Sequence, residues 1–478
     1  MFSSSDALWS SPLAQELAAV LYVLLSVIVT IDVLLKKSDV RGALGWIGLV
    51  WLAPILGSLL YYMFGINRVT RRALKLRMDR ENALPGTTVR PDAAAHIVKL
   101  SDVSQTVTQC PLTGGNALDI LEGGDAAYPA MLAAIRGAKS CIAMSSYIFR
   151  NDAAGNEFAD ALIEAAQRGV RVRVLLDGVG MGYFYPAVYY RMKRSGVTGA
   201  RFLHTWLPWR MPFLNMRNHR KLLVVDGAVA FVGGINIGTE NYARTPVPRR
   251  VQDVHFCVRG PAVKIVMDAF ARDWTFTTDE ELDDDGWWPD EIGPQGSVFV
   301  RGLRSGPDGD LYRLESLLGA ALSLAQKRVR IVTPYFLPDA RLQFAIQQAA
   351  LRGVAVEIVL PFRSDQRVMD WAMRGHLRFF RHVGASFSAT SPPFDHSKLC
   401  TVDGEWSLIG SSNWDARSFR LNFEFDLEII DRDLTARIDA LIDERIGRGT
   451  MLTPDMLAAE PLWIRLRNAA ARLAMPYL

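Results

Sequence analysis

A short pattern of residues occurs twice in this chain, in stretches far apart in the sequence. Residues 218–227 read Asn-His-Arg-Lys-Leu-Leu-Val-Val-Asp-Gly, and residues 395–404 read Asp-His-Ser-Lys-Leu-Cys-Thr-Val-Asp-Gly. Both contain His-x-Lys-x4-Asp-Gly, and in both an Asn, Asn236 or Asn413, follows at the same distance from the His. One copy of so short a motif carries a real risk of chance. Two copies with the same internal spacing predict a duplicated unit.

Each copy is expected to lie on a β-strand. If residues 219–226 and 396–403 are strands, side chains alternate between the two faces with a period of two residues. His219 and Lys221 then share one face of the first strand, and His396 and Lys398 share one face of the second. Each strand would present an imidazole beside an ammonium group.

The repeat extends beyond the motif. Residues 161–170 match residues 345–354, and the Tyr-Ile-Phe at 147 matches the Tyr-Phe-Leu at 335. Around the first of these, residues 140–148 and 170–176 have strand patterns and residues 156–168 have a helical one. Alternating strands and helices indicate an α/β fold, and 478 residues exceed one hydrophobic core. We expect two pseudo-symmetric α/β/α halves packed together.

Two long apolar runs precede this scaffold. Leu17–Leu35 is interrupted only by Asp32, and Gly42–Ile66 contains no charged residue. Either could cross a hydrocarbon core of about 30 Å, which takes roughly 20 helical residues. We expect an N-terminal two-helix transmembrane hairpin, although Pro54 and Gly57 permit a kink or a re-entrant turn, and a buried soluble hairpin is the alternative. Residues 1–16 contain no Lys or Arg, which disfavours a signal peptide.

The basic flanks of these runs predict their orientation. Lys36, Lys37 and Arg41 lie between the runs, whereas six Lys and Arg residues follow within 68–80. The heavier positive flank is normally cytoplasmic, so we expect both termini and the large domain inside the cell. The expected anchors at the membrane interface are Trp46, Trp51, Tyr61 and Tyr62.

The chain thus divides into six expected parts. They are a transmembrane hairpin with a basic segment (1–81), a linker (82–114), a first half (115–278), an acidic linker (279–295), a second half (296–450) and an amphipathic tail (451–478).

Composition excludes some classes of protein. A net charge of +4 is small for this length and argues against bulk nucleic acid as the main partner. A hydrophobic fraction of 50% favours membrane contact. The four cysteines lack the spacing of a metal site, and we interpret them as buried reduced thiols.

Two further segments leave alternatives open. Trp206–Arg217 mixes Trp, Phe, Leu and Met with Arg, which suits either a lipid-facing surface or a loop that caps the core. Residues 461–473 form an amphipathic helix candidate that lies on the membrane or packs on the domain.

Cleavage of a phosphodiester requires a nucleophile, stabilisation of charge on the phosphoryl oxygens and a proton for the leaving alkoxide. Two motif copies supply all three without a metal or another cofactor. One neutral imidazole attacks phosphorus, and the other, protonated, donates to the departing oxygen. The groups that we expect to bind the phosphoryl oxygens are Lys221, Lys398, Asn236, Asn413 and Ser411.

The doubled motif, with Gly-x-x-Asn after each copy, resembles the signature of the phospholipase D superfamily, whose double-motif members bring both copies into one active site. Within that superfamily the chain is similar to bacterial cardiolipin synthases over nearly all of its length. The similar stretches are the N-terminal hairpin, residues 215–221, the Gly-Gly-Ile-Asn-Ile-Gly run and residues 411–418. One departure is Gly234, which stands where the second copy has Ser411.

This resemblance implies transfer of a phosphatidyl group from one phosphatidylglycerol to another, with release of glycerol, at a bacterial inner membrane. It also implies that Asp253 and Glu424 orient the two histidines, with His219 as nucleophile and His396 as general acid. Asp226 and Asp403 complete the catalytic motif. Their place before a Gly favours a role in capping the turn.

Two other functions compete with this one. A phospholipase D-type hydrolase or nuclease would use water as acceptor, and the motifs do not show the acceptor. The membrane hairpin and the modest charge disfavour a nuclease. A catalytically idle membrane scaffold is disfavoured because both motifs are intact.

Overall fold

The computed structural model describes residues 12–37, 40–65, 89–182, 184, 186–205, 216–247, 249–284, 286–289, 292–380, 384–453, 456, 459–473 and 475. The chain divides into two compact units. We call residues 1–71 with 205–215 the N-terminal unit, and residues 72–204 with 216–478 the large unit. The basic residues at 68–80, and all of the 206–217 segment except its last two residues, lie outside the described residues.

The N-terminal unit consists of α2 (Pro12–Lys36), α3 (Val40–Leu52), α4 (Pro54–Leu60) and a π-helical turn, η1 (Tyr61–Gly65). Within α2, residues Gln15–Lys36 are long and apolar enough to cross a bilayer, and in the described part of the chain no other helix is. The expected second span is broken at Pro54, because proline lacks the N–H that would continue the helix. The two-span hairpin is therefore only partly present.

Instead, α4 runs back along α3. The rings of Trp46 and Tyr61 lie 5.4 Å apart, although a continuous helix would separate these two residues by about 22 Å. A Cβ at Gly57 would lie 2.7 Å from the carbonyl oxygen of Leu49, so only glycine allows the two helices to approach this closely. Tyr61 is 2% exposed, and this burial replaces its expected role as an interface anchor.

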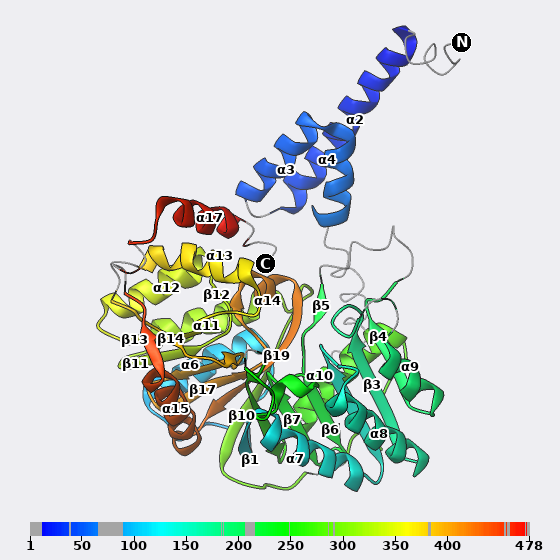
Figure 1. Cartoon of the computed structure of the whole chain (residues 1–478), viewed down its shortest axis with the longest axis vertical. Coiled ribbons are helices and arrows are strands. Elements are labelled where there is room, and N and C mark those ends of the chain that lie inside the picture. Colours follow the sequence, from blue (N-terminus) through cyan, green and yellow to red (C-terminus); the bar gives the residue numbers. More distant parts are fainter. Residues whose placement is uncertain are drawn as a thin grey trace. The chain divides into compact units, whose positions relative to one another are not determined.

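The elements of the large unit occur in two matching series, as Figure 1 shows. The first series is β1 (Thr113–Glu122), α7 (Gly123–Gly137), β2 (Cys141–Ser146), α8 (Ala153–Gln167), β3 (Arg171–Asp177), α9 (Ala187–Arg194), β4 (Thr198–Phe202), β5 (Arg217–Asn218), β6 (Leu222–Val225), β7 (Val229–Gly233), β8 (Val251–Gln252), β9 (Val254–Arg259) and α10 (Val263–Thr278).

The second series is β10 (Val298–Ser305), α11 (Arg313–Leu324), β11 (Arg328–Val332), β12 (Phe336–Leu337), α12 (Ala340–Leu351), β13 (Ala355–Pro361), α13 (Arg367–Leu377), β14 (Ser386–Thr390), β15 (Phe394–Asp395), β16 (Leu399–Val402), β17 (Trp406–Gly410), β18 (Trp414–Asp415), α14 (Ala416–Arg420), β19 (Asn422–Ile430) and α15 (Arg432–Gly447). The short strand β20 (Gly449–Met451) and helix α17 (Leu462–Leu473) follow.

Both series belong to one mixed sheet. Its order is β20-β14-β13-β11-β16-β17-β19-β10-β1-β9-β7-β6-β2-β3-β4, and β5 pairs with β19. The order of the first half, read outward from β1, repeats that of the second half, read outward from β10. The antiparallel β1–β10 pair joins them, so the expected α/β halves share a continuous sheet.

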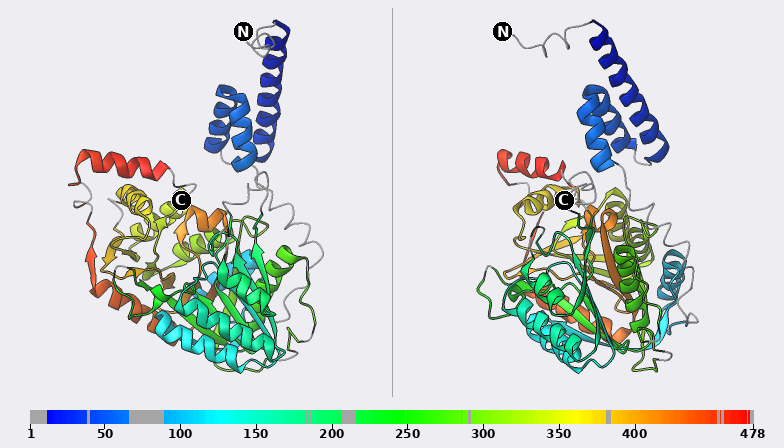
Figure 2. Two further views of the ribbon diagram at one scale, coloured as in Figure 1. Left: turned by 45° about the vertical axis from the view of Figure 1, so that its right-hand side comes forward. Right: turned by 90° about the vertical axis from the view of Figure 1, so that its right-hand side faces the viewer.

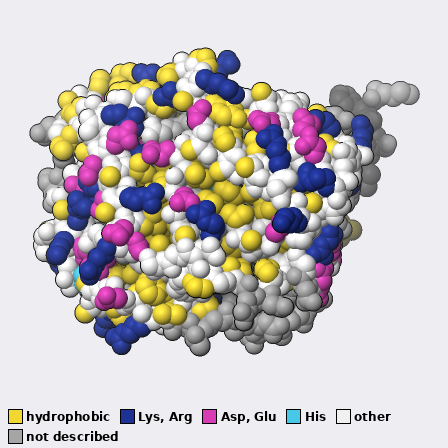
Figure 3. Space-filling view, turned by 90° about the horizontal axis from the view of Figure 1, so that it is seen from below, with side chains coloured by type: hydrophobic (Ala, Val, Ile, Leu, Met, Phe, Trp, Pro, Cys, Tyr) yellow, Lys and Arg dark blue, Asp and Glu magenta, His cyan; other side chains and the backbone are white. Residues whose placement is uncertain are grey.

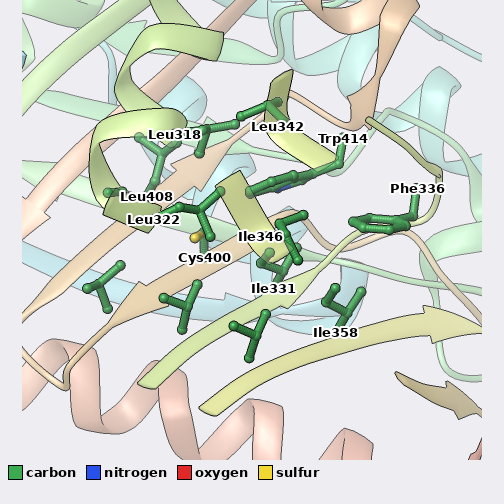
Figure 4. Close-up of a cluster of buried hydrophobic side chains, with 14 of the residues drawn as sticks. Leu318, Leu322, Ile331, Phe336, Leu342, Ile346, Ile358, Cys400, Leu408 and Trp414 are labelled. Carbon is green, nitrogen blue, oxygen red and sulfur yellow. The ribbon is translucent and has the colours of Figure 1, made fainter. Parts of the chain in front are cut away.

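Both faces of this sheet are buried, which explains the apolar runs in its strands. In β6, Leu223 and Val225 pack in one cluster with residues of α7 and α8. Leu222 and Val224 are also buried and point to the opposite face, because side chains alternate along a strand. In the second half a cluster that includes Trp414, Phe336 and Ile346 fills the space between sheet and helices, as Figure 4 shows.

The structure differs from two expected linkers. Ala95–Thr108, within the first, forms helix α6, because Ile97 and Leu100 are buried in the core of the second half. In the acidic stretch after residue 278, Trp287 is 2% exposed, and Glu280 accepts a hydrogen bond from the indole of Trp274. All four cysteines are buried and free, as expected.

Candidate active site

The two motif histidines stand just before the strands that were expected to contain them. The strands β6 and β16 begin at Leu222 and Leu399, after the lysines. The residues ahead of each strand cross to the other half of the unit. There β5 pairs with β19, β15 pairs with β8, and the backbone N–H of His219 donates to the carbonyl of Phe423.

This crossing pairs each imidazole with a carboxylate of the opposite half. His219 Nδ1 lies 2.9 Å from Glu424 Oε2, and His396 Nδ1 lies 2.7 Å from Asp253 Oδ2. A carboxylate on Nδ1 fixes the tautomer and leaves Nε2 to face a ligand. The two ring centroids are 6.5 Å apart, so the two copies of the motif form one site.

Burial controls the charge of the imidazoles. It lowers the pKa of His219 to about 4, and Glu424 only partly opposes this shift. The pKa of His396 is also lowered, by burial and by the Lys398 cation, against the opposing effect of Asp253. Burial alone would raise the pKa of Asp253, but Lys398 and His396 outweigh it and hold this carboxyl below its ordinary value. The carboxylates are thus charged, and the imidazoles favour the neutral form without substrate.

Two buried ammonium groups lie beside the imidazoles. Lys221 Nζ donates to the carbonyl of His219 at 2.6 Å, and Lys398 Nζ donates to the carbonyl of His396. Burial lowers the pKa of Lys221 to about 7 and also lowers that of Lys398. A phosphodiester anion in the site would oppose these shifts, because a nearby negative charge favours the protonated form of lysine and histidine.

Two of the expected phosphate ligands remain available to a ligand. The carbonyl oxygen of the Asn236 side chain accepts from the N–H of Ile148 at 3.1 Å, which turns the amide nitrogen the other way. Asn413 is 4% exposed. The hydroxyl of Ser411 instead donates to Glu424 Oε2 at 2.6 Å, which favours a role in holding that carboxylate. In the first half Asp253 occupies the space beside Gly234 that such a side chain would need.

The motif aspartates are bound to backbone. Asp226 accepts from the N–H groups of Lys139, Ser140 and Cys141, and Asp403 accepts from those of residues 326–328. Both aspartates have φ of 52° and stand before a glycine. This geometry favours the turn-capping role over a direct part in the chemistry.

Several residues around the site were not identified from the sequence. Tyr147 packs edge-on against His219 with 4.9 Å between the ring centroids, and Tyr335 takes the matching place 6.4 Å from His396. Their place in the repeat was visible in the sequence, but their contact with the histidines was not.

Two buried ion pairs hold the motif loops. Arg220 pairs with Asp273 of α10 at 2.7 Å, and Asp395 pairs with Arg445 of α15 at 2.8 Å. The cation is on the loop in the first half and on the helix in the second. The signal available in the sequence was a charged residue within each apolar helical stripe.

This arrangement can exchange one ester of a phosphate for another. The opposed imidazoles can act on opposite sides of a phosphorus atom, as displacement requires, while the ammonium groups neutralise the phosphoryl oxygens. In the described residues no group of three or more His, Cys, Asp or Glu side chains could hold a metal ion. Such a site on a duplicated α/β fold defines an enzyme of the phospholipase D class.

The chain belongs to the family described as "Cardiolipin synthase, PLD-like domain", which matches residues 131–274 and 318–446. The description "Phospholipase_D-nuclease N-terminal" matches residues 24–65. Together with the apolar helix α2, this match fits a membrane protein.

Curated relatives agree with this family. The major cardiolipin synthase of Bacillus subtilis is 29% identical over 475 residues, which cover 96% of this chain and 98% of the relative. A cardiolipin synthase of Geobacillus sp. strain WCH70 is 30% identical over 446 residues, or 91% and 88% of the two chains.

A solved structure supports the fold. Phosphatidylserine synthase of Haemophilus influenzae is similar with a TM-score of 0.60 and 17% identity, over 80% of this chain and all of the other.

Proposed function

We propose that this chain is a cardiolipin synthase, which transfers a phosphatidyl group from one phosphatidylglycerol to a second and releases glycerol. The observation that carries the proposal is the buried pair of opposed imidazoles, each oriented by a carboxylate of the other half. The family and its curated relatives support the choice of substrates. The six parts expected from the sequence remain our division of the chain, with α6 added to the second half.

The first step forms a phosphohistidine. His219 is neutral at physiological pH, so its Nε2 attacks the phosphorus of phosphatidylglycerol while the P–O bond to the glycerol headgroup breaks. His396, protonated once the anionic substrate is bound, donates its proton to the departing oxygen. In the second step His396 accepts the proton of the attacking hydroxyl of another phosphatidylglycerol, and the N–P bond breaks.

The ionic partners of the site suit these steps. Glu424 stabilises the positive charge that His219 gains when it forms the N–P bond. Lys221 and Lys398, with Asn236 and Asn413, are placed to bind the phosphoryl oxygens. Asp253 orients His396 for its two proton transfers.

The competing function is a phospholipase D-type hydrolysis with water as acceptor. Purified enzyme with phosphatidylglycerol vesicles distinguishes the two when the lipid products are measured by mass spectrometry. We expect cardiolipin and free glycerol in near-equal amounts, with phosphatidic acid as a minor product. Added glycerol should drive the reaction backwards, because either alcohol can attack the phosphohistidine. Phosphatidic acid without cardiolipin would assign the chain to the hydrolases.

We further propose that the enzyme lies in the bacterial inner membrane with its large unit in the cytoplasm, but with one complete crossing. Ser26 Oγ donates to the carbonyl of Val50, near the end of α3, and the hydroxyl of Tyr61 donates to Asp32. The segment 40–65 thus rises along α2 to the level of Ser26 and returns. From Ser26 to Lys36 is about 15 Å of helix, half of a hydrocarbon core of about 30 Å.

The charges favour this re-entrant arrangement over two spans. It places Lys36, Lys37, Arg41 and the basic residues at 68–80 on one side of the membrane, while residues 1–16 on the other side contain no Lys or Arg. Two full spans would instead leave three basic residues outside, against the usual positive-inside distribution. The amino terminus is therefore periplasmic in our proposal, whereas the sequence alone predicted it to be cytoplasmic.

Cysteine labelling in whole cells tests this topology. Ser5→Cys and Ser38→Cys, both outside the described residues, form a matched pair, and the four native cysteines are buried. We expect a membrane-impermeant maleimide to label Ser5→Cys in intact cells and Ser38→Cys only after permeabilisation. The reverse pattern would establish two complete spans and contradict the proposal.

A further inference from the structure

Helix α17 packs on α13 with a polar residue facing inward. The two helices lie side by side at the edge of the large unit, as Figures 1 and 2 show. A Cβ at Gly375 of α13 would lie 2.5 Å from the carbonyl oxygen of Asn468, so the helices approach closely there. Asn468 is fully buried, and its amide donates to Glu460 at 3.1 Å. The tail therefore packs on the domain, as one of the two sequence alternatives required.

The outward side of α17 is apolar. Leu466 is 61% exposed, Trp463 is 63% exposed, and Leu462 and Leu473 are exposed still more, at 68% and 75%. Leu462, Leu466 and Leu473 recur at the helical spacing i, i+4, i+11, which places them on one strip of the helix. This pattern is inverted relative to an ordinary surface helix, which turns its apolar strip toward the core and its polar side chains toward water.

Basic side chains flank this strip, and α17 contains no acidic residue. On a helical projection Arg465 and Arg472 lie on one side of the strip and Arg467 on the other. Arg467 stacks over Trp371 of α13 at 4.5 Å, and Arg472 over Phe379 at 4.7 Å, so these two side chains are held beside the strip. Another face of the large unit, shown in Figure 3, instead has acidic and basic side chains interspersed.

We propose that the outward face of α17 docks on the surface of a bilayer that contains anionic phospholipid. The four apolar side chains enter the boundary between headgroups and acyl chains, and the three arginines bind lipid phosphates around them. The charge decides the occupant: a second copy of α17 would bring three more arginines to the same place and repel, whereas anionic headgroups neutralise them. This inference rests on α17 alone and holds whichever reaction the active site catalyses.

Site-specific fluorescence on the full chain tests the docking. A cysteine replaces Leu466, or Glu444 on α15 as a control, and carries an NBD label. Only the introduced thiols react, because the native cysteines are buried. Figures 1 and 2 place α15 at the opposite end of the large unit from α17, and Glu444 is exposed.

The protein is reconstituted into vesicles of phosphatidylcholine with or without an equal amount of phosphatidylglycerol. In the anionic vesicles we expect the label at 466 to shift its emission to the blue and to lose at least half its intensity to doxyl-labelled lipid, while the label at 444 does neither. Arg465→Glu added to the Leu466→Cys chain should reduce both effects at least two-fold.

Three results would overturn the proposal. Equal quenching of the two labels by aqueous iodide would mean that α17 faces water. Effects of the same size in pure phosphatidylcholine would remove the assignment to anionic lipid. Shielding from iodide that grows with protein density, without quenching by doxyl lipid, would mean that a second copy covers the helix. Because fluorescence is measured and not turnover, failure here is distinct from failure of the proposed reaction.

Discussion

Replacing either motif histidine with alanine should reduce cardiolipin formation by on the order of 10³ or more, as for catalytic groups that act as a unit. His219 and His396 serve successive parts of one displacement, so loss of either stops the same cycle. The double variant should be little worse than the poorer single variant. The measurement is initial cardiolipin formation from phosphatidylglycerol, compared with His96→Ala as a control, since His96 binds Asp403 and no group of the site.

Trapping the intermediate distinguishes the two histidines. Rapid acid-free quenching of enzyme with labelled phosphatidylglycerol should place the phosphatidyl group on His219 and leave it absent from His219→Ala. The label on His396 would reverse the roles. The label on a serine or an aspartate would reject the phosphohistidine mechanism altogether.

Much of this site could be anticipated from the sequence because the duplication is visible in it. The spacing of His219 and His396 from their lysines and asparagines is the same in both copies, and local order alone preserves such spacing. The apolar runs of β6 and β16 also predict buried strands, since a sheet covered on both faces needs apolar residues on both.

The pairing across halves could not be anticipated. Asp253 lies closer in sequence to His219 than to His396, yet it binds His396, because β15 crosses to pair with β8. Such long-range pairing leaves no local periodicity. The reversal at Pro54 was likewise hidden, since the uncharged run Gly42–Ile66 has the same hydropathy whether it crosses the bilayer or turns within it.

Replacing the two orienting carboxylates with amides should shift opposite limbs of the pH profile. The active free enzyme has neutral His219 and protonated His396, so the acidic limb of kcat/KM reports the pKa of His219, about 4, and the alkaline limb reports that of His396. Glu424 raises the pKa of His219, so Glu424→Gln should move the acidic limb to lower pH. Asp253 raises the pKa of His396, so Asp253→Asn should move the alkaline limb to lower pH and narrow the profile.

Both variants should also lose turnover, by about 10² to 10⁴, because an amide does not stabilise the imidazolium that each step forms. Asp426→Asn is the matched control: it is buried two residues from Glu424 but binds Ser412, so neither limb should move. If Asp253→Asn shifted the acidic limb and Glu424→Gln the alkaline one, His396 would be the nucleophile. Unshifted limbs in both variants would show that the carboxylates do not set the charge of the histidines, and the proposed division of acid and base would fail.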